Sequence, residues 1–300
     1  MNTVHQDTFS SYHPLVNLVY FVLVLLFTMF VLHPAILLIS LLAGISYAVQ
    51  LKGWAGLGKS LWYLLCLGLF AIAVNVAFNH EGATILGYMP SGNPLTLESM
   101  LYGIAAAAML VAAIVWFGCF TVVMTSDKLI YLFGRVLPAF SLVLSMTLRF
   151  VPRFKAQLQA ISQAQRCIGR DVSTGSLWQR GRLAIQMISI LITWAMENAI
   201  ETADSMRSRG YGLPGRTAFS IYRFTRRDKL ALLWLCSNGV LLGAGWWLGG
   251  LSWQYYPLLQ VSWDTPLSAG TQLLYLFLCI TPIILNYREA QQWTHLRSSL

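Results

Sequence analysis

Long apolar runs without charge dominate the chain. The segments 14–51, 60–80, 99–126 and 230–263 contain no Asp, Glu, Lys or Arg. A helix needs about 20 apolar residues to cross a hydrocarbon core about 30 Å thick. The first run is nearly twice that length, and the proline after His33 at its middle disfavours continued helix. The pattern therefore predicts an all-α integral membrane protein with about six transmembrane helices, expected at 15–32, 34–50, 60–79, 99–125, 230–250 and 268–286.

The long segment between the fourth and fifth apolar runs has a different pattern. It is expected to break at Pro138 and again at Pro152. An amphipathic helix is then predicted over 153–170, with one stripe formed by Phe154, Leu158, Ile161, Gln165 and Ile168. A second helix is predicted from about Leu177 to Ser208. In its second half Met196, Ile200, Ala203 and Met206 oppose acidic residues. Such helices could lie in the membrane interface against lipid or pack under the bundle.

Charge gives these segments an orientation. The chain is 57% hydrophobic and only 10% charged, against about 25% charged in ordinary globular proteins. Of its 20 Lys and Arg residues, 16 fall between Lys128 and Lys229, whereas the loops 80–98 and 251–267 carry only acidic charge. By the positive-inside rule, the basic segment and both termini are expected in the cytoplasm. The predicted division is 1–126 (four spans), 127–229 (cytoplasmic or interfacial helices) and 230–300 (two spans and a tail).

The sequence contains few residue patterns that would indicate catalysis. The sequence has no GxxxxGK[ST], HExxH or CxxC motif, and the predicted spans contain no charged residue. We therefore expect no metal, no cofactor and no enzymatic activity. Two alternatives stay open. A self-contained permease would need ionisable residues or broken helices near the midplane. A membrane-embedded transferase would have to use Glu197, Glu201 and Asp204, which on one helix more often form a solvated face.

The ends of the two predicted cytoplasmic helices are the most distinctive feature. One ends around Arg166-Cys167-Ile168-Gly169-Arg170, and the other around Arg207-Ser208-Arg209-Gly210. Glycine just past a helix relieves the steric penalty of a left-handed cap. A basic residue there could simply complement the helix dipole. A guanidinium at such a tip could also make paired hydrogen bonds to carboxylates in a partner's groove.

This part of the chain resembles the transmembrane T component of energy-coupling factor (ECF) transporters. The resemblance covers about residues 128–230. Outside this region, only the hydropathy pattern of the spans is similar to that of the family. The segments that match in order and spacing are Leu137-Pro138, Leu148-Arg149-Phe150-Val151-Pro152, Ala164-Gln165, Asp204-Ser205-Met206-Arg207-Ser208-Arg209-Gly210-Tyr211 and Arg226-Arg227-Asp228. In that family both helix tips carry a small-Arg-Gly triplet. Ser208-Arg209-Gly210 fits it, whereas Cys167-Ile168-Gly169 lacks the arginine.

The resemblance implies a non-catalytic scaffold in the plasma membrane of a prokaryote. Its expected partners are two cytoplasmic ABC-type ATPase subunits, a small membrane S component that captures a vitamin or metal ion, and membrane lipid, with no nucleic acid. The residues implied at the ATPase-coupling surface are Cys167, Ile168, Gly169, Arg166, Arg170, Ser208, Arg209 and Gly210. Those implied in the structural motif are Pro138, Arg149, Pro152, Asp204 and Arg207. The transported substrate is not encoded here, because in such systems the S component selects it.

Overall fold

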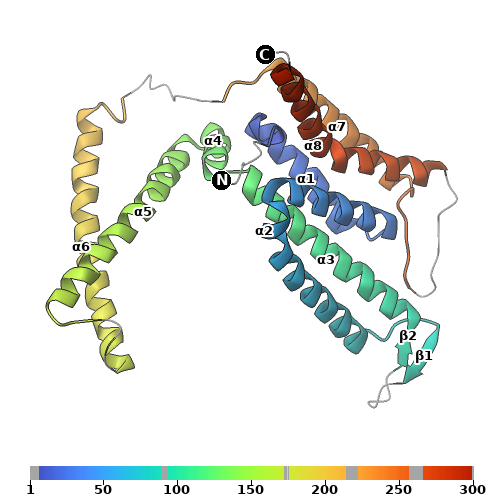
Figure 1. Cartoon of the computed structure of the whole chain (residues 1–300), viewed down its shortest axis with the longest axis horizontal. Helices are drawn as coiled ribbons and strands as arrows, with labels where there is room; N and C mark the ends of the chain where they lie inside the picture. Colours follow the sequence, from blue (N-terminus) through green and yellow to red (C-terminus); the bar gives the residue numbers. More distant parts are fainter. Residues whose placement is uncertain are drawn as a thin grey trace. The chain divides into compact units, whose positions relative to one another are not determined.

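The computed structural model describes residues 7–88, 94–171, 174, 176–213, 222–256 and 266–298 (Figure 1). The chain divides into two compact units. The bundle unit comprises Met1–Lys128 and Tyr222–Leu300, and the inserted unit comprises Leu129–Ile221. The chain thus leaves the bundle unit after Lys128 and returns to it at Tyr222. The three-part division expected from the sequence concerns membrane sidedness and stays a prediction.

The described elements are almost all helical, which confirms the predicted fold class. The bundle unit contains the short 3-10 helix η1 (Phe9–Ser11), α1 (Pro14–Phe30), α2 (Pro34–Phe78), α3 (Leu97–Val123), α7 (Arg226–Trp247) and α8 (Pro266–Ser298). Helix α4 (Ser126–Val136) starts in the bundle unit and continues into the inserted unit, which also holds α5 (Pro138–Cys167) and α6 (Leu177–Ser208).

A small hairpin in the first acidic loop was not predicted. Strand β1 (Ile85–Tyr88) pairs antiparallel with β2 (Pro94–Thr96), with Ile85 opposite Thr96 and Tyr88 opposite Pro94. The buried carboxylate of Glu98 on α3 holds the start of the hairpin in place. It accepts hydrogen bonds from the amide (3.2 Å) and the hydroxyl (2.5 Å) of Thr84, the residue before β1. The alternation that signals a strand is too short here to stand out from the flanking apolar sequence.

Six described helices are long and apolar enough to cross a membrane, although they are not the same six as predicted. They are Pro34–Trp54, Ser60–Phe78, Leu97–Val123, Leu177–Ser208, Arg226–Trp247 and Pro266–Glu289. Five match predicted spans. The predicted first span is α1, which has 17 residues, about 25 Å at 1.5 Å per residue and so at the short end of the spanning range. In α6 the uncharged stretch between Arg182 and Glu197 has only 14 residues, which is more typical of an interfacial or core helix. Its cytoplasmic placement therefore stays our prediction.

Two local expectations about helix ends were wrong. The loop predicted between the second and third spans is a kink inside α2, where Gly53 adopts φ 71°. Glycine takes this angle readily because it lacks a Cβ. Pro138 begins α5 as predicted, but Pro152 does not break it. A proline removes one backbone hydrogen bond, and the long helical segments on both sides keep the 30-residue α5 continuous.

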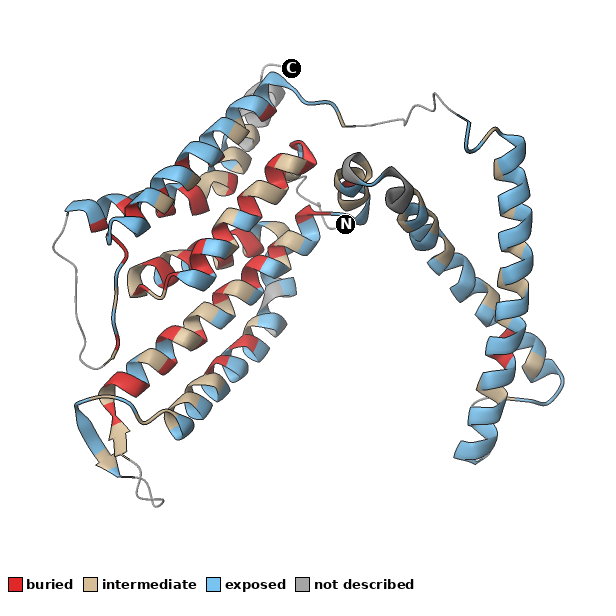
Figure 2. Cartoon of the chain, turned by 180° about the vertical axis from the view of Figure 1, so that it is seen from behind, coloured by how far each residue is buried: buried red, intermediate tan, exposed pale blue. Residues whose placement is uncertain are grey.

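The core of the bundle unit is centred on Trp116 of α3. Its ring lies near Tyr20 and Phe21 of α1 and Tyr47 of α2, and all four residues are buried. Figure 2 shows buried residues concentrated on α1 and on the inward side of α3. The indole Nε1 donates to the carbonyl (3.2 Å) and hydroxyl (3.0 Å) of Ser40. Packing of this kind holds transmembrane helices together where lipid supplies no hydrophobic driving force.

Candidate coupling site

Helices α5 and α6 end in the same backbone geometry. We define the first tip as residues 165–170 and the second tip as residues 206–211. In the first tip the amide of Gly169 donates to the Arg166 carbonyl (2.9 Å), and the amide of Arg170 to the Gln165 carbonyl (2.9 Å). In the second tip the amide of Gly210 donates to the Arg207 carbonyl (3.0 Å), and the amide of Tyr211 to the Met206 carbonyl (3.0 Å). Each pair of bonds is a Schellman motif.

The glycines make these ends possible. Gly169 has φ 75° and Gly210 has φ 77°, the left-handed region in which a side chain is strained. The predicted glycine caps are therefore confirmed. The shared geometry also sets the correspondence between the tips: Cys167 with Ser208 as the last helical residues, and Ile168 with Arg209 at the C-cap. The position that carries arginine in one tip carries isoleucine in the other.

The second tip presents its arginine to the outside. Arg209 and Arg207 are both exposed, and Asp204 is exposed one turn earlier. Among the residues that the structure describes, no ion pair involves Arg209. A Cβ on Gly210 would lie 3.1 Å from a methyl group of Leu213, so the chain after the tip also packs closely against the glycine.

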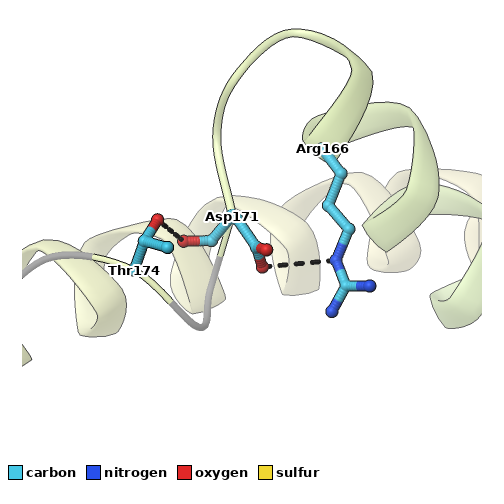
Figure 3. Close-up of polar contacts among 3 residues, drawn as sticks. All are labelled: Arg166, Asp171 and Thr174. Carbon is cyan, nitrogen blue, oxygen red and sulfur yellow. Dashed lines mark hydrogen bonds and ion pairs between the residues drawn. The ribbon is translucent and has the colours of Figure 1, made fainter.

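The first tip presents an apolar side chain beside a paired charge. Ile168 is 69% exposed. Arg166, one residue before the end of α5, directs its Nε to a carboxylate oxygen of Asp171 at 3.2 Å (Figure 3). The Asp171 carbonyl also accepts from the Thr174 hydroxyl at 3.2 Å (Figure 3). Part of the positive charge at this tip is therefore already compensated within the chain, while Arg170 stays exposed.

The two tips lie on one packed pair of helices. The Phe154 ring of α5 meets the Trp194 ring of α6 edge to face at 5.9 Å, and Ile161 and Met187 are buried. Helix α6 starts with a capping box formed by Ser176 and Gln179, which sets its first residue. Because only residues 168–176 separate the end of α5 from the start of α6, the tips lie at opposite ends of the pair. At 1.5 Å per residue, the 32 residues of α6 span about 48 Å.

Most of the amphipathic stripe predicted on the second half of α6 is exposed in the structure. Met196 and Ile200 are each 63% exposed. The residues with intermediate exposure in this part of α6 are Leu191, Trp194, Ala195, Asn198, Thr202 and Met206, so Met206 is the one member of the predicted stripe that is not exposed. On α5, Ile161 of the predicted stripe is buried whereas Phe154 and Leu158 are 37% and 38% exposed. Periodicity found the helices, but it could not say which apolar face meets a neighbour within the chain.

The remaining motif residues lie away from the tips. Arg149 and Pro152 are exposed on the first half of α5, and Pro138 is its first residue. Among the described residues, no three His, Cys, Asp or Glu side chains gather as a metal site would require. Glu197, Glu201 and Asp204, the acidic residues of the transferase alternative, are exposed along α6.

Comparison with known proteins gives a family match. The model of the cobalt transport protein family (CbiQ) matches residues 8–219. The chain belongs to this family. The matched region contains α1 to α6 and both tips, so this CbiQ-family protein carries the family signal in both of its units.

Its relatives include proteins named energy-coupling factor transporter transmembrane protein EcfT. The protein of Listeria monocytogenes is 28% identical over 224 residues, which is 70% of this chain and 77% of that protein. The protein of Lacticaseibacillus paracasei is 35% identical over 106 residues (35% and 38% of the two chains). That of Exiguobacterium sibiricum is 36% identical over 103 residues (34% and 39%). The last two alignments thus span about two fifths of each relative's length. These findings confirm the resemblance to a T component, and the chain is a multi-pass membrane protein.

Proposed function

We propose that this protein is the non-catalytic T component of an ECF-type importer. In this proposal it binds two cytoplasmic ABC-type ATPase subunits through its two tips and a small S component within the membrane. Both termini lie in the cytoplasm of a prokaryotic cell, and the S component selects a vitamin or a metal ion. The observation that carries the proposal is the pair of matching Schellman ends, exposed at opposite ends of a packed helix pair.

The spacing of the tips favours two separate contacts. With α6 about 48 Å long, the first and second tips are too far apart to enter one groove. A pair of long helices joined by an edge-to-face ring contact and buried side chains can transmit a displacement from one end to the other. Two ATPase subunits, each receiving one tip, match this geometry.

The chemistry of the second tip suits an acidic groove. A guanidinium presents a planar fork that bonds both oxygens of a carboxylate. Arg209 is exposed at the C-cap with its backbone fixed by the two hydrogen bonds of the motif. A fixed backbone lowers the entropy lost when the side chain docks.

A self-contained permease receives less support from the bundle unit. One cluster of buried hydroxyls in its spans is satisfied internally: the Thr28 hydroxyl lies 2.8 Å from the Ser40 hydroxyl and 2.8 Å from the Tyr275 hydroxyl. Among the described residues, the buried side-chain oxygens of Asn75 and Asn238 have no hydrogen-bond partner. Bonded hydroxyls hold helices together, and both asparagines are neutral, whereas ionisable groups inside a span are the usual mark of a substrate or ion site.

Co-purification tests the proposal directly. The full chain, tagged and expressed with the other subunits of its own system, should bring down two ATPase subunits and one small membrane protein in detergent. Recovery of the chain alone at normal expression, with the same tag and detergent, would contradict the proposal.

The purified chain without partners should not hydrolyse ATP. The sequence has no phosphate-binding loop. Phosphate release should equal that of empty detergent micelles, and should rise when the ATPase subunits are added. Hydrolysis above background in a partner-free preparation would place catalysis in this chain and overturn its role as a scaffold.

The two tips should be unequal in strength. Ile168→Ala removes apolar contact area from a side chain that carries no charge, so ATPase recovery should fall by less than about tenfold, or about 1.4 kcal/mol. Arg209→Ala should reduce recovery by more than that. The comparison is a pull-down at matched expression, with Leu177→Ala, an exposed apolar residue at the start of α6, as the control. Equal losses for Ile168→Ala and Arg209→Ala would show that the tips are equivalent.

A further inference from the structure

We infer that residues Asp7–His13, here called the N-terminal clamp, hold together the two chain segments that connect the bundle unit to the inserted unit. The clamp would thereby fix the points at which the chain leaves the bundle unit toward α5 and α6 and returns from them. This inference rests on the proposed function and adds to it a positioning element outside both tips. All the contacts that support it lie within the bundle unit.

The clamp is anchored in the bundle by its first residues. Phe9 is 1% exposed, and its ring lies 4.9 Å from that of Tyr20 in α1. The carboxylate of Asp7 accepts from the Tyr47 hydroxyl of α2 (2.9 Å) and from the Asn286 amide of α8 (2.6 Å). A buried aromatic side chain and a carboxylate bonded to two helices fix this segment to the bundle.

The outgoing connection is held by Lys128, the last residue of the bundle unit before the inserted unit. Lys128 is buried, and its Nζ donates to the carbonyl of Ser10 (2.5 Å) and to that of Val123 (2.8 Å). The side-chain oxygen of Asn17 accepts from the same Nζ at 3.2 Å when the amide nitrogen of Asn17 donates to the Phe9 carbonyl. Burial lowers the pKa of Lys128, which the carboxylate of Asp7 opposes. The buried ammonium of Lys128 is thus surrounded by three oxygens, from Ser10, Val123 and Asn17. This is the environment of a lysine held inside the protein and not of one that extends to solvent.

The returning connection is held by the next residues of the clamp. The Asp228 carboxylate accepts from the His13 amide at 3.0 Å. The Arg227 guanidinium lies 4.3 Å from the centre of the Tyr12 ring and donates to the Ser11 hydroxyl at 3.2 Å. Asp228 also caps α7 through the amide and hydroxyl of Thr225. One carboxylate therefore sets both the start of α7 and its attachment to the clamp.

Both connections therefore meet on four consecutive residues, Ser10 to His13. A chain spans at most about 3.6 Å per residue, so these attachment points are held within about 11 Å of each other. Movement of α5 and α6 can reach the bundle unit only if the two segments that connect the units are held in place. Without the clamp, ATPase movement at the tips would be taken up by these connections instead of reaching α3 and α7.

The test uses the complete transporter in lipid vesicles. The clamp variant is Lys128→Met with Arg227→Gln, and the matched control is Lys229→Met with Arg226→Gln, which removes the same charges from exposed neighbours. Substrate uptake per ATP hydrolysed should fall at least tenfold in the clamp variant and stay unchanged in the control, with ATPase subunits recovered in normal amounts from both. An unchanged uptake ratio in the clamp variant would overturn the inference. Absence of ATPase subunits from the wild-type preparation would instead contradict the proposed function.

A distance measurement tests the clamp without activity. Spin labels at Ser126→Cys and Arg223→Cys, both exposed, report the separation of the two connections, with the exposed Cys66, Cys167 and Cys236 changed to serine. The distance distribution should be narrow in the wild type and at least twice as wide in the clamp variant. Should the double variant fail to fold, Arg227→Gln alone provides the comparison. Equally narrow distributions in clamp variant and control would overturn the inference.

Discussion

Arg209→Glu is expected to abolish recovery of at least one ATPase subunit while the chain still inserts in the membrane. Arg209 is exposed at the C-cap of α6 with its backbone fixed by the Schellman bonds. If the guanidinium docks on carboxylates, glutamate replaces attraction with repulsion inside a desolvated contact. Truncating one partner of such a pair costs about 2–5 kcal/mol, which corresponds to about 30- to 4,000-fold weaker binding.

Two further variants separate docking from general damage. Arg209→Lys should recover part of the binding, because lysine keeps the charge but lacks the planar fork. Arg182→Glu changes an exposed arginine near the start of the same helix and should bind normally. The measurement is pull-down of ATPase subunits at matched expression, together with uptake in vesicles. Full transport by Arg209→Glu would leave this arginine only the role of complementing the helix dipole.

Trp116→Ala should destabilise the bundle unit by about 3–5 kcal/mol, the range seen when a large buried aromatic residue is truncated. The residue is fully buried among Tyr20, Phe21 and Tyr47. Its removal leaves a cavity and takes the indole donor from the Ser40 carbonyl. Gly44 faces the same indole, where a Cβ would lie 3.1 Å from Nε1, so the backbone of α2 already lies close against Trp116.

The matched control is Trp62→Ala, because Trp62 is 66% exposed on the second half of α2. Truncation there opens no cavity, since lipid or detergent occupies the space. Unfolding of the isolated chain by denaturing detergent, followed by tryptophan fluorescence and far-ultraviolet circular dichroism, measures both variants. Equal stabilities for Trp116→Ala and Trp62→Ala would contradict the assignment of Trp116 to the core.

The sequence by itself determined features that depend on neighbours along the chain. The bounds of α6 agree with those predicted, Leu177 to Ser208, because apolar periodicity and the glycine after Arg209 act within a few residues. Positive φ at Gly169 and Gly210 was predicted for the same reason. Five of the six predicted spans correspond to helices long and apolar enough to cross a membrane, since hydropathy depends on composition alone.

The tertiary structure decided features that depend on residues far apart in the sequence. Lys128 looked like one of many basic residues, yet it is buried against the carbonyl of Ser10, and Asp7 bonds to Asn286 near the other end of the chain. No local periodicity encodes such pairs. The same holds for the face of α6 that packs, because Met196 and Ile200 are exposed although they are no less apolar than Trp194, which contacts Phe154 of α5. Apolar character is local, whereas burial is decided by the helices that pack against it.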